Sequence, residues 1–285
     1  MLVTPEELKF DFKGAKFDPS RSADREMLRW IFSQFLYGEV TGIQCGHWLY
    51  RAPHFNAATF LAKQATEELS HVRKFVRILS LLGVRPEPAH WVVRFLSSGM
   101  MGHTWGEHVA LEMALGEGLV LGAFYALVDT IADPEIHRIL ASAAGEEERH
   151  VEFGEREAQA WLGSHPETRS ELLAQAILQA WALKKLKSFI SRRLLQGELR
   201  DHPVLLQFDA FFAHSIQRFE LRIERVGLSR VPLGDLGRFE RIWLVATLPM
   251  RKIISRIRFK APLLTATYLE DPDLQESPER IRPSL

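Results

Sequence analysis

Two Glu-x-x-His pairs are the residues of this chain whose types and spacing are best suited to chemistry. The pairs are Glu68 with His71 and Glu147 with His150. Residues three apart on an α-helix lie on one face, about 4.5 Å apart along the axis, so both side chains of a pair can reach one ion. Carboxylate oxygen and imidazole nitrogen are common donors to iron and other transition metals. If the surrounding sequence is helical, each pair is therefore a candidate for metal binding.

The elements that carry these pairs are indeed predicted to be helical. Apolar residues recur in alternating steps of three and four, which is typical of packed helices. This pattern predicts four long helices, over about residues 22–50, 56–82, 104–132 and 134–162. In each helix one glutamate occupies a mid-stripe position where an aliphatic residue is expected: Glu39, Glu68, Glu117 and Glu147. A buried carboxylate costs several kcal/mol unless it is paired, protonated or bound to metal.

The spacing of the four glutamates is regular. Glu39 and Glu68 are 29 positions apart, and Glu117 and Glu147 are 30 apart. One Glu-x-x-His match alone is weak, since Glu87-Pro-Ala-His90 also fits in a proline-rich turn. Six residues on four matched stripes are far more specific. Two divalent cations would neutralise four carboxylates, so the pattern predicts a dinuclear metal site inside a four-helix bundle.

These residues resemble the ligands of the ferritin-like di-iron carboxylate superfamily. The resemblance covers about residues 22–163 and rests on two glutamates and two short segments: Glu39, EELSH (67–71), Glu117 and EEERH (146–150). It implies an all-α, ferritin-like four-helix bundle, to which this chain adds C-terminal helices.

The resemblance also implies a role for each residue. The terminal ligands, one to each iron, would be Glu39 and Glu117. The bridging carboxylates would be Glu68 and Glu147. The nitrogen ligands would be His71 and His150. The glutamates that hold these histidines from behind would be Glu67 and Glu146.

The activity implied by the resemblance is that of a non-haem di-iron oxygenase or oxidase. Such an enzyme would use two iron ions and O₂ to oxidise an organic substrate. The ligand types would equally accept manganese or a mixed manganese–iron pair. The single cysteine, Cys45, cannot form a rubredoxin-type iron site, so electrons would come from a separate reductase or ferredoxin. The alternatives are a ferroxidase or iron-handling role without an organic substrate, and a ligand-binding protein with a manganese–iron pair.

Glycines beside two of the glutamates allow two interpretations. They are either a seam of close helix packing or the wall of a substrate cavity. The candidate cavity residues are Gly42, Ile43, Gly46, Met113, Gly118, Leu121 and Gly122, followed by Phe124 and Tyr125. Such a lining would favour an apolar, lipid-like small molecule.

Composition and charge bound the remaining possibilities. The chain has 285 residues, 46% of them hydrophobic, and no net charge, which argues against a disordered chain and against a dedicated nucleic-acid binder. Residues 1–180 carry 17 Lys and Arg against 24 Asp and Glu, whereas residues 181–260 carry 17 against 7. We therefore divide the chain into an N-terminal segment, the bundle, a basic helical extension and a loose tail: 1–21, 22–165, 166–260 and 261–285.

The basic extension is expected to form three helices, near residues 168–196, 203–226 and 235–259. The last contains both basic and large apolar residues. It would cover the bundle, form a homodimer contact or lie on an anionic membrane surface, and the basic charge would also suit an acidic electron donor. The longest unbroken apolar run, residues 119–128, is short of the ~20 residues of a membrane span. We expect a cytoplasmic protein, with peripheral membrane contact as an option.

Several other residues are given structural roles. Cys45 is expected to fill space in the core. Four histidines are expected at the surface or as helix caps: His47, His54, His103 and His108. Glu112 is expected to point into solvent.

Overall fold

The structure, a computed structural model, describes residues 1–99, 102–194 and 199–258. This part of the chain is all-helical, as predicted, and its one extended contact is an isolated bridge between Phe17 and Ile131. The predicted tail, 261–285, lies outside the described residues, as do the predicted ends of two helices at 196 and 259 and part of the glycine-rich break at 98–102.

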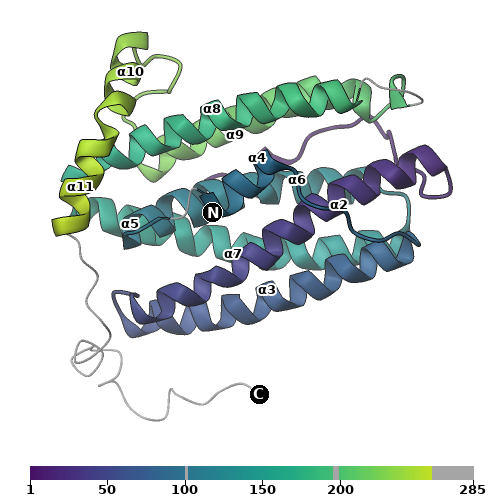
Figure 1. Cartoon of the computed structure of the whole chain (residues 1–285), viewed down its shortest axis with the longest axis horizontal. Helices are drawn as coiled ribbons and strands as arrows, with labels where there is room; N and C mark the ends of the chain where they lie inside the picture. Colours follow the sequence, from purple (N-terminus) through teal and green to yellow (C-terminus); the bar gives the residue numbers. More distant parts are fainter. Residues whose placement is uncertain (100–101, 195–198, 259–285) are drawn as a thin grey trace.

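Four long helical stretches contain the candidate metal ligands. They are α2 (Ser22–Gly42) with the 3-10 segment η1 (Ile43–Tyr50), α3 (Phe55–Leu81), the third stretch, and α7 (Pro134–Ser164). The third stretch consists of α5 (Trp105–Glu107), the π-helix η3 (His108–Glu117) and α6 (Gly118–Thr130). In Figure 1, α2, α3 and α7 run side by side, and the third stretch packs along α7.

Local sequence signals explain where these helices begin and end. The Asp133 side chain accepts hydrogen bonds from the backbone N–H groups of Glu135 and Ile136, both at 2.9 Å, and Pro134 takes the first helical position of α7. The His54 ring caps α3 by accepting from the N–H of Ala57 at 3.1 Å. After α3, the chain turns at Gly83 with φ +66°, a conformation that favours glycine.

Two of the predicted continuous helices change type along their length. The helix predicted over 22–50 becomes a 3-10 helix after Gly42, and the one predicted over 104–132 is a π-helix from His108 to Glu117. A π-helix has more residues per turn than an α-helix, so it rotates the residues that follow relative to an α-helical register. Both changes occur within a few residues of a candidate ligand, Glu39 or Glu117.

The remaining helices cover the four long stretches. In chain order they are α1 (Pro5–Leu8), α4 (Trp91–Arg94), η2 (Phe95–Gly99), η4 (Pro166–Thr168), α8 (Arg169–Leu194), η6 (Leu205–Gln207), α9 (Phe208–Val226), α10 (Arg238–Ala246) and α11 (Leu248–Arg258). The helices α8 and α9 lie along η3, and α10 and α11 contact one end of α8 (Figure 1). One apolar cluster is shared by both parts, since Val109 and Phe153 belong to it together with Ile177 and Ile223.

The third stretch is the most apolar helix of the described residues. Trp105–Thr130 has a mean hydropathy of 1.6 over its most apolar window and is long enough to cross a membrane, although its unbroken apolar run is short. That window is 61% buried within the protein. Such burial is what the core helix of a soluble protein shows, so the helix is weak support for a membrane span.

Candidate metal centre

The structure brings all six candidate ligands together between the four long stretches. Glu39 lies on α2, and Glu117 is the last residue of η3. The two Glu-x-x-His pairs lie on α3 and α7. Five of the six side chains are at most 5% exposed: Glu39, Glu68, His71, Glu147 and His150. Glu117 is partly buried, and its Oε2 atom is shielded from solvent.

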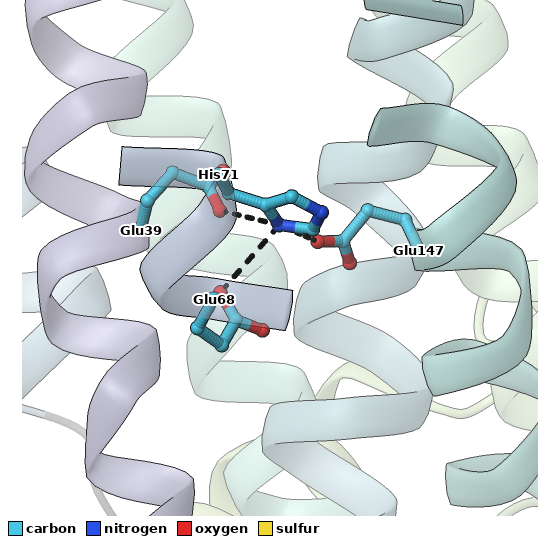
Figure 2. A group of neighbouring side chains, drawn as sticks. All are labelled: Glu39, Glu68, His71 and Glu147. Atoms are coloured by element: carbon cyan, nitrogen blue, oxygen red, sulfur yellow. Dashed lines mark hydrogen bonds and ion pairs between the residues drawn. The ribbon is translucent and has the colours of Figure 1, made fainter. Parts of the chain in front are cut away.

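The first group of ligands is centred on His71 (Figure 2). The Nδ1 atom of His71 lies 3.0 Å from Oε2 of Glu39, 3.1 Å from Oε1 of Glu147 and 3.8 Å from Oε2 of Glu68. Each of these four residues offers one donor atom, and the four atoms lie within 4.8 Å of one another. That spacing allows a single cation to contact all of them.

The second group adjoins the first and shares a residue with it. It consists of Glu68, Glu117 and His150, again with donor atoms within 4.8 Å of one another. The Nδ1 atom of His150 is 3.4 Å from Oε1 of Glu68 and 3.6 Å from Oε2 of Glu147. Because both oxygens of Glu68 and Glu147 face the two imidazoles, these carboxylates lie between the rings of His71 and His150.

Glu67 and Glu146, which precede the candidate ligands Glu68 and Glu147 in sequence, hydrogen-bond to the Nε2 atoms of the two histidines. Oε2 of Glu146 on α7 lies 2.8 Å from Nε2 of His71 on α3, and Oε2 of Glu67 on α3 lies 2.7 Å from Nε2 of His150 on α7. A carboxylate accepts the Nε2 proton, which leaves the Nδ1 lone pair for a metal. The ammonium of Lys74 in turn binds Glu146, so this support is itself fixed.

The pKa values of the clustered carboxyl and imidazole groups indicate that the cluster carries excess negative charge, which a cation would neutralise. Burial, and then the charges of Glu147 and Glu68, raises the pKa of Glu39 to about 8, and burial with the Glu147 charge raises that of Glu117. Burial alone would lower the pKa of His71, but its hydrogen bonds to Glu147, Glu39 and Glu68 raise it to about 12. Protons therefore take the place of cations in the metal-free protein.

Three polar atoms of the cluster support the same conclusion. Oε2 of Glu117, Oε2 of Glu147 and Nδ1 of His150 are buried and have no hydrogen-bond partner within the described residues. Buried polar atoms are normally satisfied, and leaving one unpaired costs about 1–3 kcal/mol. All three atoms belong to candidate ligands, so the two cations inferred from the sequence would satisfy them together.

Metal binding is expected to release protons, because the ligands must give up the protons that they hold in the metal-free state. Affinity should therefore rise with pH through the pKa of Glu39, about 8. Calorimetric titration with Mn²⁺ in buffers of different ionisation enthalpy gives the number of protons released. A titration without proton release, and with an affinity independent of pH, would contradict this assignment.

A cavity of about 490 Å³ adjoins the cluster. The four ligand glutamates form part of its wall. The rest is mostly apolar and comes from α2, α6, α8 and the start of α9, including Phe35, Leu119, Leu183 and Phe208. A molecule in this cavity would contact the candidate metal ligands and otherwise apolar groups.

The cavity lies on a different face of the third stretch than the sequence suggested. Of the seven candidate cavity residues, only Gly42 lines it; the other six do not: Ile43, Gly46, Met113, Gly118, Leu121 and Gly122. Phe124 and Tyr125 do not line it either. The stretch instead presents Gly116, Leu119, Val120 and Ala123, which share one face of the helix, next to the stripe of Glu117, Leu121 and Phe124.

Two of the excluded residues have packing roles. A Cβ on Gly118 would lie 2.0 Å from Nη1 of Arg222, so this glycine makes room for α9. Met113 contacts the backbone of Gly154, where a Cβ would lie 2.5 Å from Met113 Cβ. At these positions the structure therefore shows close helix packing. This was the alternative to a substrate cavity that the glycine pattern left open.

Gly42 lies directly against one of the candidate ligands. A Cβ at this position would lie 2.6 Å from Oε2 of Glu68. The Gly42→Ala variant is therefore expected to displace that carboxylate and to lower metal affinity by about 10–100-fold, the range for disturbing a ligand's support. Gly38→Ala, one turn earlier on α2 with nothing within 4 Å of its Cβ, is the matched control. Equal affinities of the two variants in equilibrium dialysis would refute this role.

Two residues that line the cavity differ from their sequence-based expectations. His108 is only 2% exposed, and Glu112 is partly buried; their side chains meet at 2.9 Å and both line the cavity. The expectation that His108 is a surface or capping residue and that Glu112 points into solvent is wrong. Their i,i+4 spacing inside an apolar stretch was the available signal.

The other residues with expected structural roles lie as predicted. His54 caps a helix, His47 and His103 are exposed, and Cys45 is buried in the core.

No protein-family model matches this chain, and neither does any curated protein or solved structure. The described residues thus show an all-helical protein with a buried Glu/His group that could hold a metal ion.

Proposed function

We propose that the four long stretches form a ferritin-like four-helix bundle that binds two metal ions, and that the protein is an O₂-dependent di-iron oxidoreductase. The observation that carries the proposal is Glu68, which belongs to two adjoining groups: the first also contains Glu39, His71 and Glu147, and the second Glu117 and His150. This arrangement matches the dinuclear carboxylate sites of helix bundles. Iron is proposed first, with manganese or a mixed pair as variants of the same site.

The proposed substrate is an apolar organic molecule. The cavity is lined mainly by aliphatic and aromatic side chains, and the ligand glutamates are the part of its wall where a reaction would take place. When bound, two iron ions would supply the redox chemistry with O₂. The protein would hold the substrate beside the ligands and keep bulk water from them, since the apolar lining offers water few partners.

Several residues of the chain would keep the site ready for metal. Glu67 and Glu146 would fix the tautomers of His150 and His71, and thereby keep Nδ1 of each ring directed at the metals. Glu39 and Glu117, whose carboxyl groups have raised pKa values, would lose their protons on metal binding. Electrons would come from a separate reductase or ferredoxin, and this partner stays a prediction.

The proposal is tested by loading the protein with Fe²⁺ without oxygen and then admitting O₂ in the presence of a long-chain hydrocarbon substrate. We expect two iron ions per chain and an oxygenated or desaturated organic product detected by mass spectrometry. Oxidation of many iron ions per chain into a ferric mineral, without organic product, would replace the proposal with the iron-handling alternative.

A cavity-filling variant makes this test more specific. Ala123→Trp would fill the cavity beside α6 without changing a ligand, so product formation should be lost while two metal ions stay bound. Ala141→Trp, at an exposed position of α7, is the matched control and should keep both properties. Unchanged turnover in Ala123→Trp would show that the substrate does not occupy this cavity.

A further inference from the structure

The helices α10 and α11 carry a concentration of large apolar side chains that are exposed to solvent. The two helices stand at one end of the molecule, against α8 (Figure 1). Single apolar residues are common on protein surfaces, but several on one short segment mark an interaction site. Six large apolar side chains of these helices are between 48% and 88% exposed: Phe239, Ile242, Trp243, Met250, Ile253 and Ile254.

In α10 the exposed apolar residues form one face of the helix. Phe239, Ile242 and Trp243 have the spacing i, i+3 and i+4, which places them side by side on an α-helix. Leu244 lies on the other side of α10, where it is buried and belongs to the apolar cluster shared with the four long stretches. The exposed face of α10 therefore points away from the body of the protein.

The helix α11 is arranged in the same way. On its inner side, Leu248 belongs to the shared apolar cluster, and Nζ of Lys252 lies 3.2 Å from Oε1 of Glu107, a carboxylate that is buried in α5. These contacts hold α11 on the protein with its apolar face outward. The exposed residues of that face repeat the spacing found in α10: Met250, Ile253 and Ile254.

The charges of the same segment are mostly positive. Residues 238–258 contain six Lys or Arg and one Glu. Glu107 neutralises Lys252, whereas Arg238, Arg241 and Arg251 form no ion pair with any residue that the structure describes. Basic side chains without a counter-ion therefore accompany the exposed apolar faces.

This combination of charge and apolar surface indicates the chemistry of the partner. A second copy of the segment would bring like charges together, which opposes association. An acidic protein would neutralise the arginines, but it would also need an apolar surface that fits the six exposed side chains. An anionic lipid surface meets both requirements without a shape match, because its phosphates attract arginine while aromatic and aliphatic side chains enter the boundary between headgroups and acyl chains.

We propose that α10 and α11 bind the surface of a membrane that contains anionic lipids. Phe239 and Trp243 enter the headgroup boundary, and the arginines of the segment contact the lipid phosphates. The helices lie on the membrane without crossing it, because they have 9 and 11 residues whereas a membrane span needs ~20. Membrane binding through this face is independent of the metal centre and of the reaction proposed for it.

Vesicle sedimentation with the full-length protein tests this proposal. We expect binding to phosphatidylcholine vesicles that contain phosphatidylglycerol, weaker binding at high salt, and much weaker binding to phosphatidylcholine alone. The Phe239→Glu/Trp243→Glu variant should lower the fraction-bound constant by at least about tenfold, because it places charges in the apolar face. The Arg238→Glu/Arg241→Glu variant should lower it by at least about tenfold as well, since the headgroups would then repel the segment.

Two matched double variants show whether these losses belong to the proposed face. Val76→Glu/Trp91→Glu replaces two apolar residues outside the segment that are 51% and 69% exposed. Arg73→Glu/Arg138→Glu makes the same change of net charge at exposed positions of α3 and α7. Both variants should sediment with the anionic vesicles nearly as the wild type does. Losses as large as those of the α10 variants would overturn the assignment to this face.

Quenching of tryptophan fluorescence by brominated lipids tests the orientation of α10. Because Trp243 is 66% exposed on the proposed face, we expect part of the protein's fluorescence to be quenched when it binds anionic vesicles. The Trp243→Phe variant should still bind but show less quenching than the wild type. Equal quenching of the two proteins would place Trp243 outside the bilayer and contradict the proposed orientation.

Two further outcomes would identify a different partner. Absence of binding to the anionic vesicles at low salt would overturn the proposal and favour an acidic protein in place of the membrane. Sedimentation velocity without vesicles detects a second copy of the chain as the partner. A dimer that is lost in the Phe239→Glu/Trp243→Glu variant would overturn the proposal in favour of self-association.

Discussion

The Glu68→Ala variant is expected to lose both of the metal ions that the wild-type chain binds. Glu68 belongs to both ligand groups, so its removal should affect both positions at once. At each of the two metal positions, the loss of metal affinity should exceed the roughly 10–100-fold that follows from removing a residue that hydrogen-bonds to a ligand. Equilibrium dialysis against Mn²⁺, followed by elemental analysis, measures the metal content per chain.

Two further variants make this result interpretable. Glu39→Ala should weaken the position next to His71 and preserve the one next to His150, because Glu39 belongs to the first group alone. Glu152→Ala, on α7 with a 60% exposed side chain, should bind as the wild type does. Retention of two ions by Glu68→Ala would show that this carboxylate is not shared.

The Glu155→Gln variant is expected to lower the free energy of unfolding of the metal-free protein by about 3–5 kcal/mol. Oε1 of Glu155 on α7 accepts from Nε of Arg222 on α9 at 2.9 Å, and both side chains are at most 2% exposed. Substitution by glutamine removes the negative charge and leaves the buried guanidinium without a counter-ion. Urea denaturation of wild type and variant measures the difference.

A solvent-exposed pair on the same helix provides the control for this prediction. Glu135 binds Arg77 at 2.9 Å, but the two side chains are 39% and 57% exposed. Glu135→Gln should therefore change the free energy of unfolding by no more than about 1 kcal/mol. Similar effects of the two glutamine variants would mean that the Glu155–Arg222 pair contributes no more than a surface ion pair.

The ligand cluster could be predicted from the sequence because its signal is local. The i,i+3 spacing places Glu68 with His71 and Glu147 with His150 whatever the exact packing of the helices. The apolar stripes then orient all four glutamates toward a common interior. The all-helical fold follows from the same periodicity, and the start of α7 follows from Asp133-Pro134.

The cavity could not be located in the same way because its wall comes from several helices that are distant in sequence. On α6, Leu119 and Ala123 line the cavity, and they lie on the helix face beside the stripe of Glu117 and Leu121 that the periodicity identifies. Which of two adjacent faces borders a cavity is decided by tertiary packing. Arg222, which occupies the space beside Gly118, comes from a helix more than 100 residues away in sequence, and no local pattern predicts that contact.

Crystals soaked in Mn²⁺ would test the central claim most directly through anomalous scattering. We expect two peaks about 3.5–4 Å apart, the separation of two-metal sites, with Glu68 between them and with His71 and His150 on opposite ions. A single peak, or peaks only at surface carboxylates with the cluster empty, would contradict a shared dinuclear centre.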